Sequence, residues 1–165
     1  MDKISVKNQF PIIKHEFVEI QIPASTTQTR LYFPELPNLR NVHLLNIEAT
    51  YVRYIPVSPS NIPVINLALF QNTFLTLVDY TGKEFTHQIP LQYLNYMSES
   101  RNDSFTETLI KQFCGQRVNW TKSYIELSSN TNVANKLEVA IFSVYYADTK
   151  TGEAKSRAAN FNNMS

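Results

Sequence analysis

Three histidines are the side chains in this sequence best suited to bind a metal ion or to transfer a proton. His15, His43 and His87 stand far apart in the chain, without the short spacings that set two imidazoles side by side on one element. A cupin-like metal site needs a His-x-His pair with a nearby Glu on neighbouring strands, and no such pair occurs. We therefore predict no metal site, no cofactor and no catalytic histidine.

Acidic residues and nucleophiles give equally little sign of an enzyme. Glu48, Asp79 and Glu84 are predicted strand acids, and a hydrolase would require distant strands to bring them together. We interpret them as solvated strand residues and keep such a hydrolase as a remaining alternative. The Gly-x-Ser-x-Gly motif is absent, and three glycines in 165 residues leave no loop to cradle a phosphate. Cys114, the only cysteine, is predicted to be a buried apolar residue, so we predict that the chain is not an enzyme.

Aromatic residues suggest a different chemistry, because rings exposed on a β-sheet can stack against sugar rings. Trp120 and Tyr124 are the candidate glycan-facing aromatics, with Tyr145 and Tyr146 further along the chain. The alternative is that these rings belong to the core or to a protein interface, where aromatic side chains bury roughly 150–250 Å² each. A single Trp makes a poor sugar platform. We therefore favour core or protein interface and keep a glycan-binding or receptor-binding module as the second hypothesis.

The charge balance argues against partners that are recruited by long-range electrostatics. Fifteen basic residues face fourteen acidic ones, and Lys and Arg form no cluster, so we predict no nucleic-acid binding. The N-terminal residues lack the apolar run of a signal peptide. The longest apolar stretch, residues 62–74, is interrupted by polar residues and a proline. We expect a soluble chain without membrane insertion, made in a cytoplasm and kept there or in a particle assembled there.

The elements that must position these side chains are strands, because segments rich in Phe, Tyr, Val and Ile alternate with Pro and Asn. Gly82 supplies the positive φ of a tight hairpin, and Ser104–Glu107 forms a capping box that begins one inserted helix ending at Gly115. Pro90–Leu94 predicts a shorter turn of helix. The predicted strands are 18–22, 28–33, 40–55, 64–70, 74–80, 83–88, 118–127 and 137–147.

The longest predicted strand, 40–55, changes its apolar phase twice. Side chains alternate with a period of two along a strand, so this pattern requires a bulge or a bend. Bends of this kind occur where strands cross between packed sheets. About eight strands and one short helix in a single domain therefore predict an all-β fold, a β-sandwich of jelly-roll kind. We predict an N-terminal arm over 1–15, the sandwich domain over 16–148 and a polar C-terminal tail over 149–165.

About half of the chain has a composition and a strand pattern typical of one group of proteins. Residues 61–84, NIPVINLALFQNTFLTLVDYTGKE, and residues 89–94, IPLQYL, are strand-dense and Asn-rich, with proline-bounded loops. This texture resembles capsid and capsid-associated proteins of bacterial viruses. The resemblance implies a jelly roll that builds or decorates a virion, either a pentameric vertex (penton) protein of a tailless phage or a head-decorating protein of a tailed phage. It carries over no functional residues.

We therefore expect a non-enzymatic structural component of a virus particle, made in the host cytoplasm and located in the virion. Its expected partners are further copies of itself, in a homo-oligomer, and other virion proteins such as the major capsid protein. The arm and the tail would reach onto neighbouring subunits and fold there on binding. The candidate interface residues are the apolar side chains of these segments: Ile4, Val6, Phe10, Ile12, Ile13 and Phe161.

Overall fold

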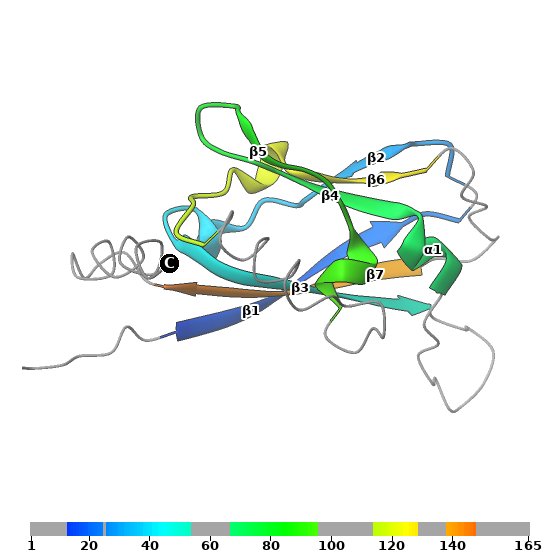
Figure 1. The fold of residues 1–165 in the computed structure, drawn as a ribbon, viewed down its shortest axis with the longest axis horizontal. Coiled ribbons are helices and arrows are strands. Elements are labelled where there is room, and N and C mark those ends of the chain that lie inside the picture. Colours follow the sequence, from blue (N-terminus) through cyan, green and yellow to red (C-terminus); the bar gives the residue numbers. More distant parts are fainter. Residues whose placement is uncertain (1–12, 25, 54–66, 96–113, 129–137, 148–165) are drawn as a thin grey trace, which may run out of the picture.

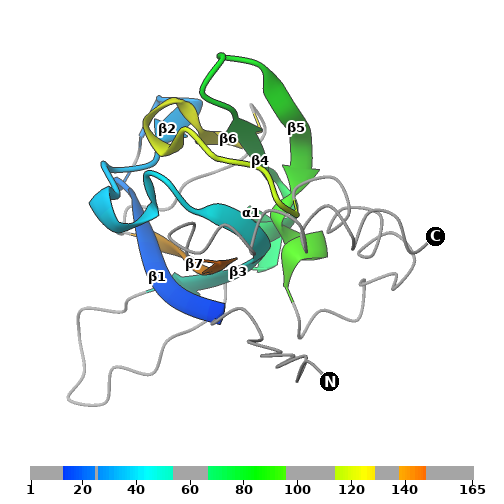
Figure 2. The same ribbon diagram turned by 90° about the vertical axis from the view of Figure 1, so that its left-hand side faces the viewer.

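The protein is a sandwich of two antiparallel sheets that lie face to face (Figures 1 and 2). The structure, a computed structural model, describes residues 13–24, 26–53, 67–95, 114–128 and 138–147. The predicted inserted helix lies outside these ranges, apart from residues 114 and 115 at its end. So do the arm and tail residues Ile4, Val6, Phe10, Ile12 and Phe161.

One sheet has three strands in the order β1-β7-β3, and the other has four in the order β2-β6-β4-β5. The prediction of a mostly β fold built as a sandwich is thus confirmed. The strands of the first sheet are β1 (Ile13–Ile22), β3 (His43–Arg53) and β7 (Glu138–Ala147). Those of the second are β2 (Arg30–Tyr32), β4 (Thr73–Val78), β5 (Glu84–Pro90) and β6 (Tyr124–Leu127).

β1 follows the alternation predicted for it. Val18, Ile20 and Ile22 point into the sandwich and are buried, whereas Glu19 and Gln21 point outward and are exposed. The strand also begins earlier than predicted, at Ile13, so that the last three residues of the predicted arm belong to the sheet. Its register with β7 is continuous from Ile13 opposite Ala147 to Ile22 opposite Glu138.

β3 contains the predicted irregularity in its first half. Its register with β7 shifts between Leu44 and Asn46, and this bulge lets both Leu44 and Ile47 point into the core. The second predicted change of phase, near residue 52, has no counterpart in the pairing, which continues without a shift to Arg53.

β4 is the central strand predicted from its apolar sequence, since it pairs with β6 on one side and with β5 on the other. The hairpin from β4 to β5 turns at Gly82, whose φ is +88°. Asp79 holds this turn, because its Oδ1 accepts hydrogen bonds from the Thr81 N–H (2.8 Å), the Thr81 hydroxyl (2.6 Å) and the Lys83 N–H (2.9 Å). The hairpin prediction is confirmed.

Two strand predictions are wrong in part. Leu67–Gln71 is the short helix α1, although residues 67–70 belong to the predicted strand 64–70, and the helix buries the consecutive residues Leu69 and Phe70. Its end is closed by side chains, since Thr73 Oγ1 donates to Leu69 O at 2.7 Å. Trp120–Lys122 is a turn of 3-10 helix, η3, because the Lys122 N–H donates to Asn119 O at 3.1 Å and the Ser123 N–H donates to Trp120 O at 3.0 Å. Only Tyr124–Leu127 of this predicted strand is β6.

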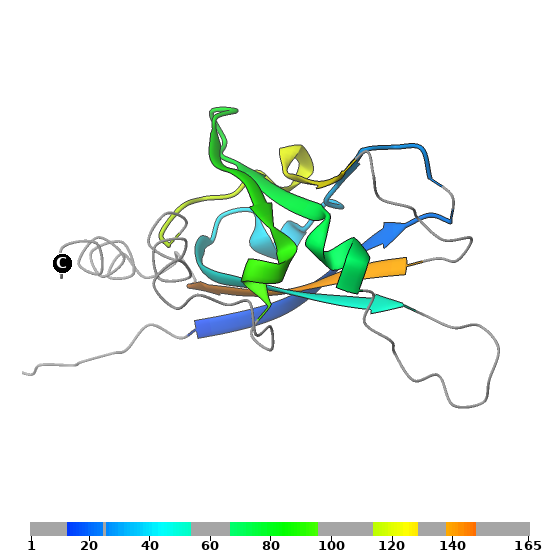
Figure 3. The same cartoon turned by 45° about the vertical axis from the view of Figure 1, so that its right-hand side comes forward.

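Short helical turns close the side of the sandwich. α1 contacts η2 (Leu91–Leu94), which also contacts β3, and the two lie beside each other where the sheets diverge (Figure 3). η2 is the short turn predicted after Pro90, and its Leu91 and Leu94 are buried. The remaining turn, η1 (Pro37–Leu39), follows β2 and buries Leu39.

The core between the sheets contains a row of three aromatic rings. Phe142 of β7 lies 5.2 Å from Phe33, and Phe33 lies 5.2 Å from Trp120, measured between ring centroids. Phe142 is fully buried, and Trp120 and Phe33 are nearly so. Aromatic pairs at this separation contribute about 0.5–1.5 kcal/mol beyond the area that they bury. The row therefore ties β7 of one sheet to the segments around β2 and β6 of the other.

The segment 115–119 joins the two sheets through its backbone. The Leu44 N–H of β3 donates to Gln116 O at 2.9 Å, and the Gly115 N–H donates to Leu44 O at 2.6 Å. At the other end, the Asn119 N–H donates to Val78 O of β4 at 2.7 Å. One end of the sandwich is thus closed by main-chain hydrogen bonds.

Candidate functional site

The outer face of the three-stranded sheet carries exposed apolar side chains where β1 forms its edge. Ile13 is 62% exposed and Phe17 is 66% exposed, and both point outward from β1. Among the described strands, β1 pairs only with β7 and stands at the edge of its sheet. We call Ile13, His15, Phe17 and Tyr145 the β1 face patch. Large exposed apolar side chains on an edge strand are typical of an interaction surface.

The rings of the β1 face patch contact one another. The His15 ring lies 4.3 Å from the Phe17 ring in an edge-on arrangement. It also stacks on Tyr145 of β7 at 4.9 Å, with an angle of 28° between the planes. The contacts agree with the register, which sets His15 opposite Tyr145. The patch is therefore a connected aromatic surface across two strands.

Polar contacts fix Tyr145 on this face. Its hydroxyl donates to Glu48 Oε2 at 3.3 Å, and Asn46 Nδ2 donates to Glu48 Oε1 at 3.4 Å. Burial raises the pKa of Tyr145, and the neighbouring Glu48 carboxylate raises it further. The phenol thus stays protonated and available as a donor at neutral pH. This arrangement orients the ring on which His15 stacks.

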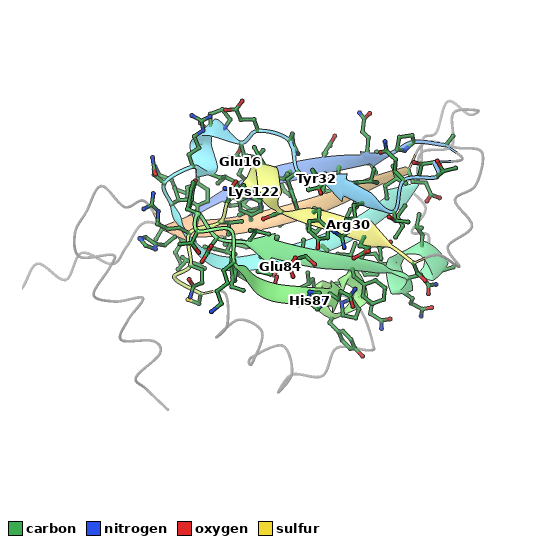
Figure 4. All side chains as sticks on the ribbon, turned by 90° about the horizontal axis from the view of Figure 1, so that it is seen from above. Glu16, Arg30, Tyr32, Glu84, His87 and Lys122 are labelled. Carbon is green, nitrogen blue, oxygen red and sulfur yellow. The ribbon has the colours of Figure 1, made fainter. Side chains whose placement is uncertain are left out.

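The outer face of the four-stranded sheet is polar and internally hydrogen-bonded. Arg30 and Tyr32 lie on β2, and Glu84 and His87 lie on β5 at the other side of the sheet (Figure 4). Tyr124 of β6 connects them. The Arg30 guanidinium lies 4.8 Å above the Tyr124 ring, and the Tyr124 hydroxyl donates to Glu84 Oε1 at 3.2 Å.

An ion pair closes one end of this row and a hydrogen bond closes the other. Arg30 Nε lies 3.5 Å from Glu126 Oε1, and His87 Nδ1 lies 2.9 Å from Glu84 Oε2. Burial raises the pKa of Tyr124, as does its contact with Glu84. Tyr124 and Glu126 raise the pKa of Arg30. The Tyr124 phenol therefore stays protonated at neutral pH and donates to Glu84, so the row is a connected polar network across this face.

A hollow of about 350 Å³ lies at one end of the sandwich, and we call it the Tyr80 pocket. Tyr80 is 47% exposed, its hydroxyl donates to Arg40 O, and the Arg117 guanidinium lies 5.2 Å from its ring centroid. The lining combines one exposed ring with amides, a hydroxyl, a carboxylate and a guanidinium: Glu35, Leu36, Arg40, Asn41, Tyr80, Asn119, Trp120 and Thr121. Such a lining can hydrogen-bond the hydroxyl groups of a sugar that stacks on the tyrosine.

Of the four aromatic residues considered as glycan-facing, Trp120, Tyr124 and Tyr146 are buried and Tyr145 is half-buried. Trp120 and Tyr124 are each 4% exposed, so neither presents a ring face to solvent, although Trp120 lines the Tyr80 pocket. Among the described Phe and Tyr residues, the exposed rings are Phe17, Tyr32 and Tyr80, none of which was predicted from the sequence. Phe17 had a signal, because it continues the outward phase of Glu19 and Gln21 on β1.

The residues considered for catalysis are dispersed. Glu48 lies on the outer face of the three-stranded sheet and Glu84 on the outer face of the four-stranded sheet, so these two acids do not face each other. His43 of β3 contacts Gly115 O through Nδ1 at 2.7 Å, whereas His87 is on β5. Burial raises the pKa of the Cys114 thiol, which lowers its reactivity.

Neither a metal site nor a membrane span is found in the described part of the chain. No three His, Cys, Asp or Glu side chains there come close enough to hold a metal ion. No helix among those ranges is long and apolar enough to cross a bilayer.

Comparison with known proteins identifies no relative. No protein-family model, curated protein or solved structure matches this chain.

Proposed function

We propose that this protein is a non-enzymatic structural subunit of a virus particle that acts through subunit–subunit interfaces. The observation that carries the proposal is the β1 face patch, where Ile13 and Phe17 stand exposed on the strand that lies at the edge of the described three-stranded sheet. A side chain of this size left in water costs about 1.5–3 kcal/mol relative to a buried one. Covering both residues with a neighbouring subunit would recover that free energy.

The strand order supports a jelly roll. A jelly roll is one long antiparallel hairpin of eight strands wrapped into two sheets, so that the first strand pairs with the last and the second with the last but one. Here β1 pairs with β7, β2 with β6, and β4 with β5. Among the described strands, β3 alone stands without the hairpin partner that this topology gives it. Gly115 and Gln116, just before β6, hydrogen-bond to β3 at Leu44.

The viral assignment rests on two further arguments. Jelly rolls are frequent in viral capsid and lectin domains. The sequence of residues 61–84 and 89–94 resembles that of capsid and capsid-associated proteins of bacterial viruses. We therefore place the protein in the virion, as a capsid vertex or capsid-decorating subunit. Its partners would be copies of itself and the major capsid protein.

The solution mass of the full chain tests this proposal. Light scattering over a range of concentrations should give a closed homo-oligomer, and a mass near five times 19.0 kDa would favour a vertex protein. Phe17→Ser should lower the mass toward that of the monomer. Tyr32→Ser, which removes another exposed ring from the other sheet, is the matched control and should leave the mass unchanged. A chain that stays monomeric at every concentration would count against the assembly proposal.

The Tyr80 pocket favours a second candidate, a jelly roll that binds a glycan or a host receptor. Its exposed ring and polar lining have the composition of a sugar site. A glycan screen tests this candidate, and Tyr80→Ala should abolish any binding found while Tyr32→Ala leaves it intact. Loss of binding in both variants, or in neither, would argue against the pocket as the site.

A further inference from the structure

We propose that the Tyr80 pocket binds a single uncharged sugar ring, which stacks on Tyr80 and has an oxygen that accepts a hydrogen bond from the indole N–H of Trp120. The inference rests on the second candidate function and names the class of sugar and the groups that would hold it. The pocket volume of about 350 Å³ lies near the lower end of the range for small-ligand sites, roughly 300–1,000 Å³. A pocket of this size suits one ring, such as the terminal residue of a glycan.

Trp120 supplies the observation that points to a ligand. Its side chain is almost completely buried and lines the pocket. Within the described part of the chain, its indole N–H has no hydrogen-bond partner, although it is not one of the fully enclosed polar atoms there. A buried tryptophan N–H usually meets an acceptor. We expect an oxygen of a ligand in the pocket to be that acceptor.

Asn119 adds a second donor to the lining of the pocket. Its Oδ1 accepts a hydrogen bond from the Thr121 hydroxyl at 3.0 Å, which fixes the orientation of the amide. Its Nδ2 has no hydrogen-bond partner among the residues that the structure describes. Thr121 also lines the pocket, and its hydroxyl oxygen can still accept a hydrogen bond. The two neighbouring side chains therefore offer a donor and an acceptor to the hydroxyl groups of a sugar.

The Tyr80 ring is held in place before any ligand binds. Its hydroxyl donates to Arg40 O, and the Arg117 guanidinium lies 5.2 Å from its ring centroid. Arg117 is fixed in turn, because its Nη2 donates to Asn41 Oδ1. Tyr80 nevertheless remains 47% exposed, so much of the ring stays open to a ligand. A ring fixed in this way loses little conformational entropy when a sugar stacks on it, and this favours binding.

The charges in the lining favour an uncharged ligand. Glu35 and Arg40 are the two ionised side chains of the lining, and Arg40 Nη2 pairs with Glu35 Oε1. A carboxylated sugar would have to displace Glu35 from Arg40, and an amino sugar would have to displace Arg40 from Glu35. Hydroxyl groups displace neither, because the other guanidinium N–H groups can donate to them and the second carboxylate oxygen can accept from them. The pair therefore selects a neutral sugar.

Calorimetric titration of the full chain with simple methyl glycosides tests this inference. The uncharged probes are the methyl glycosides of glucose, galactose, mannose and N-acetylglucosamine, and methyl glucuronide is the charged counterpart of methyl glucoside. At least one uncharged probe should bind with a dissociation constant on the order of 1 mM, as expected for a ligand of this size. Methyl glucuronide should bind at least about tenfold more weakly than that probe. Trp120 is the only tryptophan, so its fluorescence should change as the sugar binds.

Exchanging one carboxylate for an amide tests the charge argument. Glu35→Gln leaves the Arg40 guanidinium without its carboxylate and should strengthen the binding of methyl glucuronide about tenfold. Glu126→Gln is the matched control, because it removes the carboxylate of the Arg30–Glu126 pair outside the pocket and changes the net charge by the same amount. This control should leave the affinity for every probe unchanged.

Exchanging one amide tests the hydrogen-bonding argument. Asn119→Asp replaces the Nδ2 donor by an acceptor in a side chain of the same shape and should weaken the binding of the neutral sugar about tenfold. Far-ultraviolet circular dichroism would verify that every variant keeps the β fold.

The outcomes separate this inference from the second candidate function. Binding of a neutral sugar that is lost in Tyr80→Ala, changes the fluorescence of Trp120 and extends to methyl glucuronide only in Glu35→Gln supports the inference. Binding of only a charged or a longer glycan, lost in Tyr80→Ala, overturns the inference and leaves a glycan site at the pocket. A neutral sugar that leaves the fluorescence of Trp120 unchanged, or that binds Tyr80→Ala equally well, overturns the inferred contacts. A chain that binds none of these probes and no longer glycan overturns both the inference and the second candidate.

Discussion

Truncating a phenylalanine to alanine should destabilise the protein strongly at one position and hardly at all at another on the neighbouring strand. Phe142 of β7 is fully buried in the aromatic row, whereas Phe17 of β1 is 66% exposed on the opposite face of the same sheet. Phe142→Ala removes the ring contact with Phe33 and leaves a cavity, which should cost about 3–5 kcal/mol of unfolding free energy. For a domain of this size the melting temperature would fall by roughly 6–20 °C. Phe17→Ala should change the stability of the dilute monomer by less than about 0.5 kcal/mol.

Urea unfolding followed by fluorescence would measure both changes. Trp120 is the only tryptophan, and it lies at the end of the aromatic row, so its emission reports the core directly. The measurements belong at the lowest usable protein concentration, where self-association adds nothing to the stability. If Phe142→Ala prevents folding, Phe142→Leu keeps part of the side chain and should give a smaller loss in the same direction.

One result would refute the reasoning. A loss of more than about 2 kcal/mol on Phe17→Ala in dilute solution would mean that the monomer itself covers this ring. The β1 face patch would then be part of the core, and the interface argument would lose its basis. A loss of less than about 1 kcal/mol on Phe142→Ala would contradict the packing of the aromatic row.

Three further predictions concern the four-stranded sheet. Tyr124→Phe removes the hydroxyl that donates to Glu84 and should cost about 1 kcal/mol by urea unfolding, whereas an unchanged stability would show that the network contributes nothing. Asp79→Asn should destabilise the hairpin at neutral pH. Hydrogen bonds from the Thr81 hydroxyl and the Lys83 N–H lower the pKa of Asp79 in the folded protein. The Asp79 carboxylate therefore contributes fully to the stability above its unfolded-state pKa, and this contribution is lost as the pH falls through the folded-state pKa. The stability difference between the natural chain and Asp79→Asn should therefore shrink in acid, and a difference that stays constant with pH would disprove this. Gly82→Ala should cost about 1–2 kcal/mol because of the φ of +88°, since the added methyl would meet only Lys122 Nζ at 3.9 Å; equal melting temperatures would contradict the strained turn.

Local periodicity sufficed for the strands that have one buried face. Val18, Ile20 and Ile22 follow a period of two, which a strand produces and a helix does not. Gly82 marks a turn whose positive φ few other residues adopt. The bulge in β3 was also predictable, because a change of apolar phase has only a few structural solutions. These features depend on neighbours a few residues away in the sequence.

The errors arise where tertiary contacts decide. The apolar run through Leu67–Gln71 fits a buried strand or a buried helix equally well, and helical packing of Leu69 and Phe70 prevails. Trp120 was a candidate for an exposed ring, yet it packs against Phe33 from a distant part of the chain. The β1 face patch depends on which strand lies at the sheet edge, and strand order is set by long-range pairing that leaves no local pattern.

The central place of β7 affects how this protein is made. β1 and β3 pair only with β7 among the described strands, and β7 is the last of them to be synthesised. Arg53, at the end of β3, and Ala147, at the end of β7, are 94 positions apart (147 minus 53). At about 5–20 residues per second, a ribosome needs roughly 5–20 s to cover that distance. For this time the nascent chain carries β1 and β3 without their partner, so the three-stranded sheet should form only late in translation or after it. A chain that stops before Glu138 loses the whole sheet instead of one strand, and nascent forms of this protein should depend on chaperones that shield exposed strands.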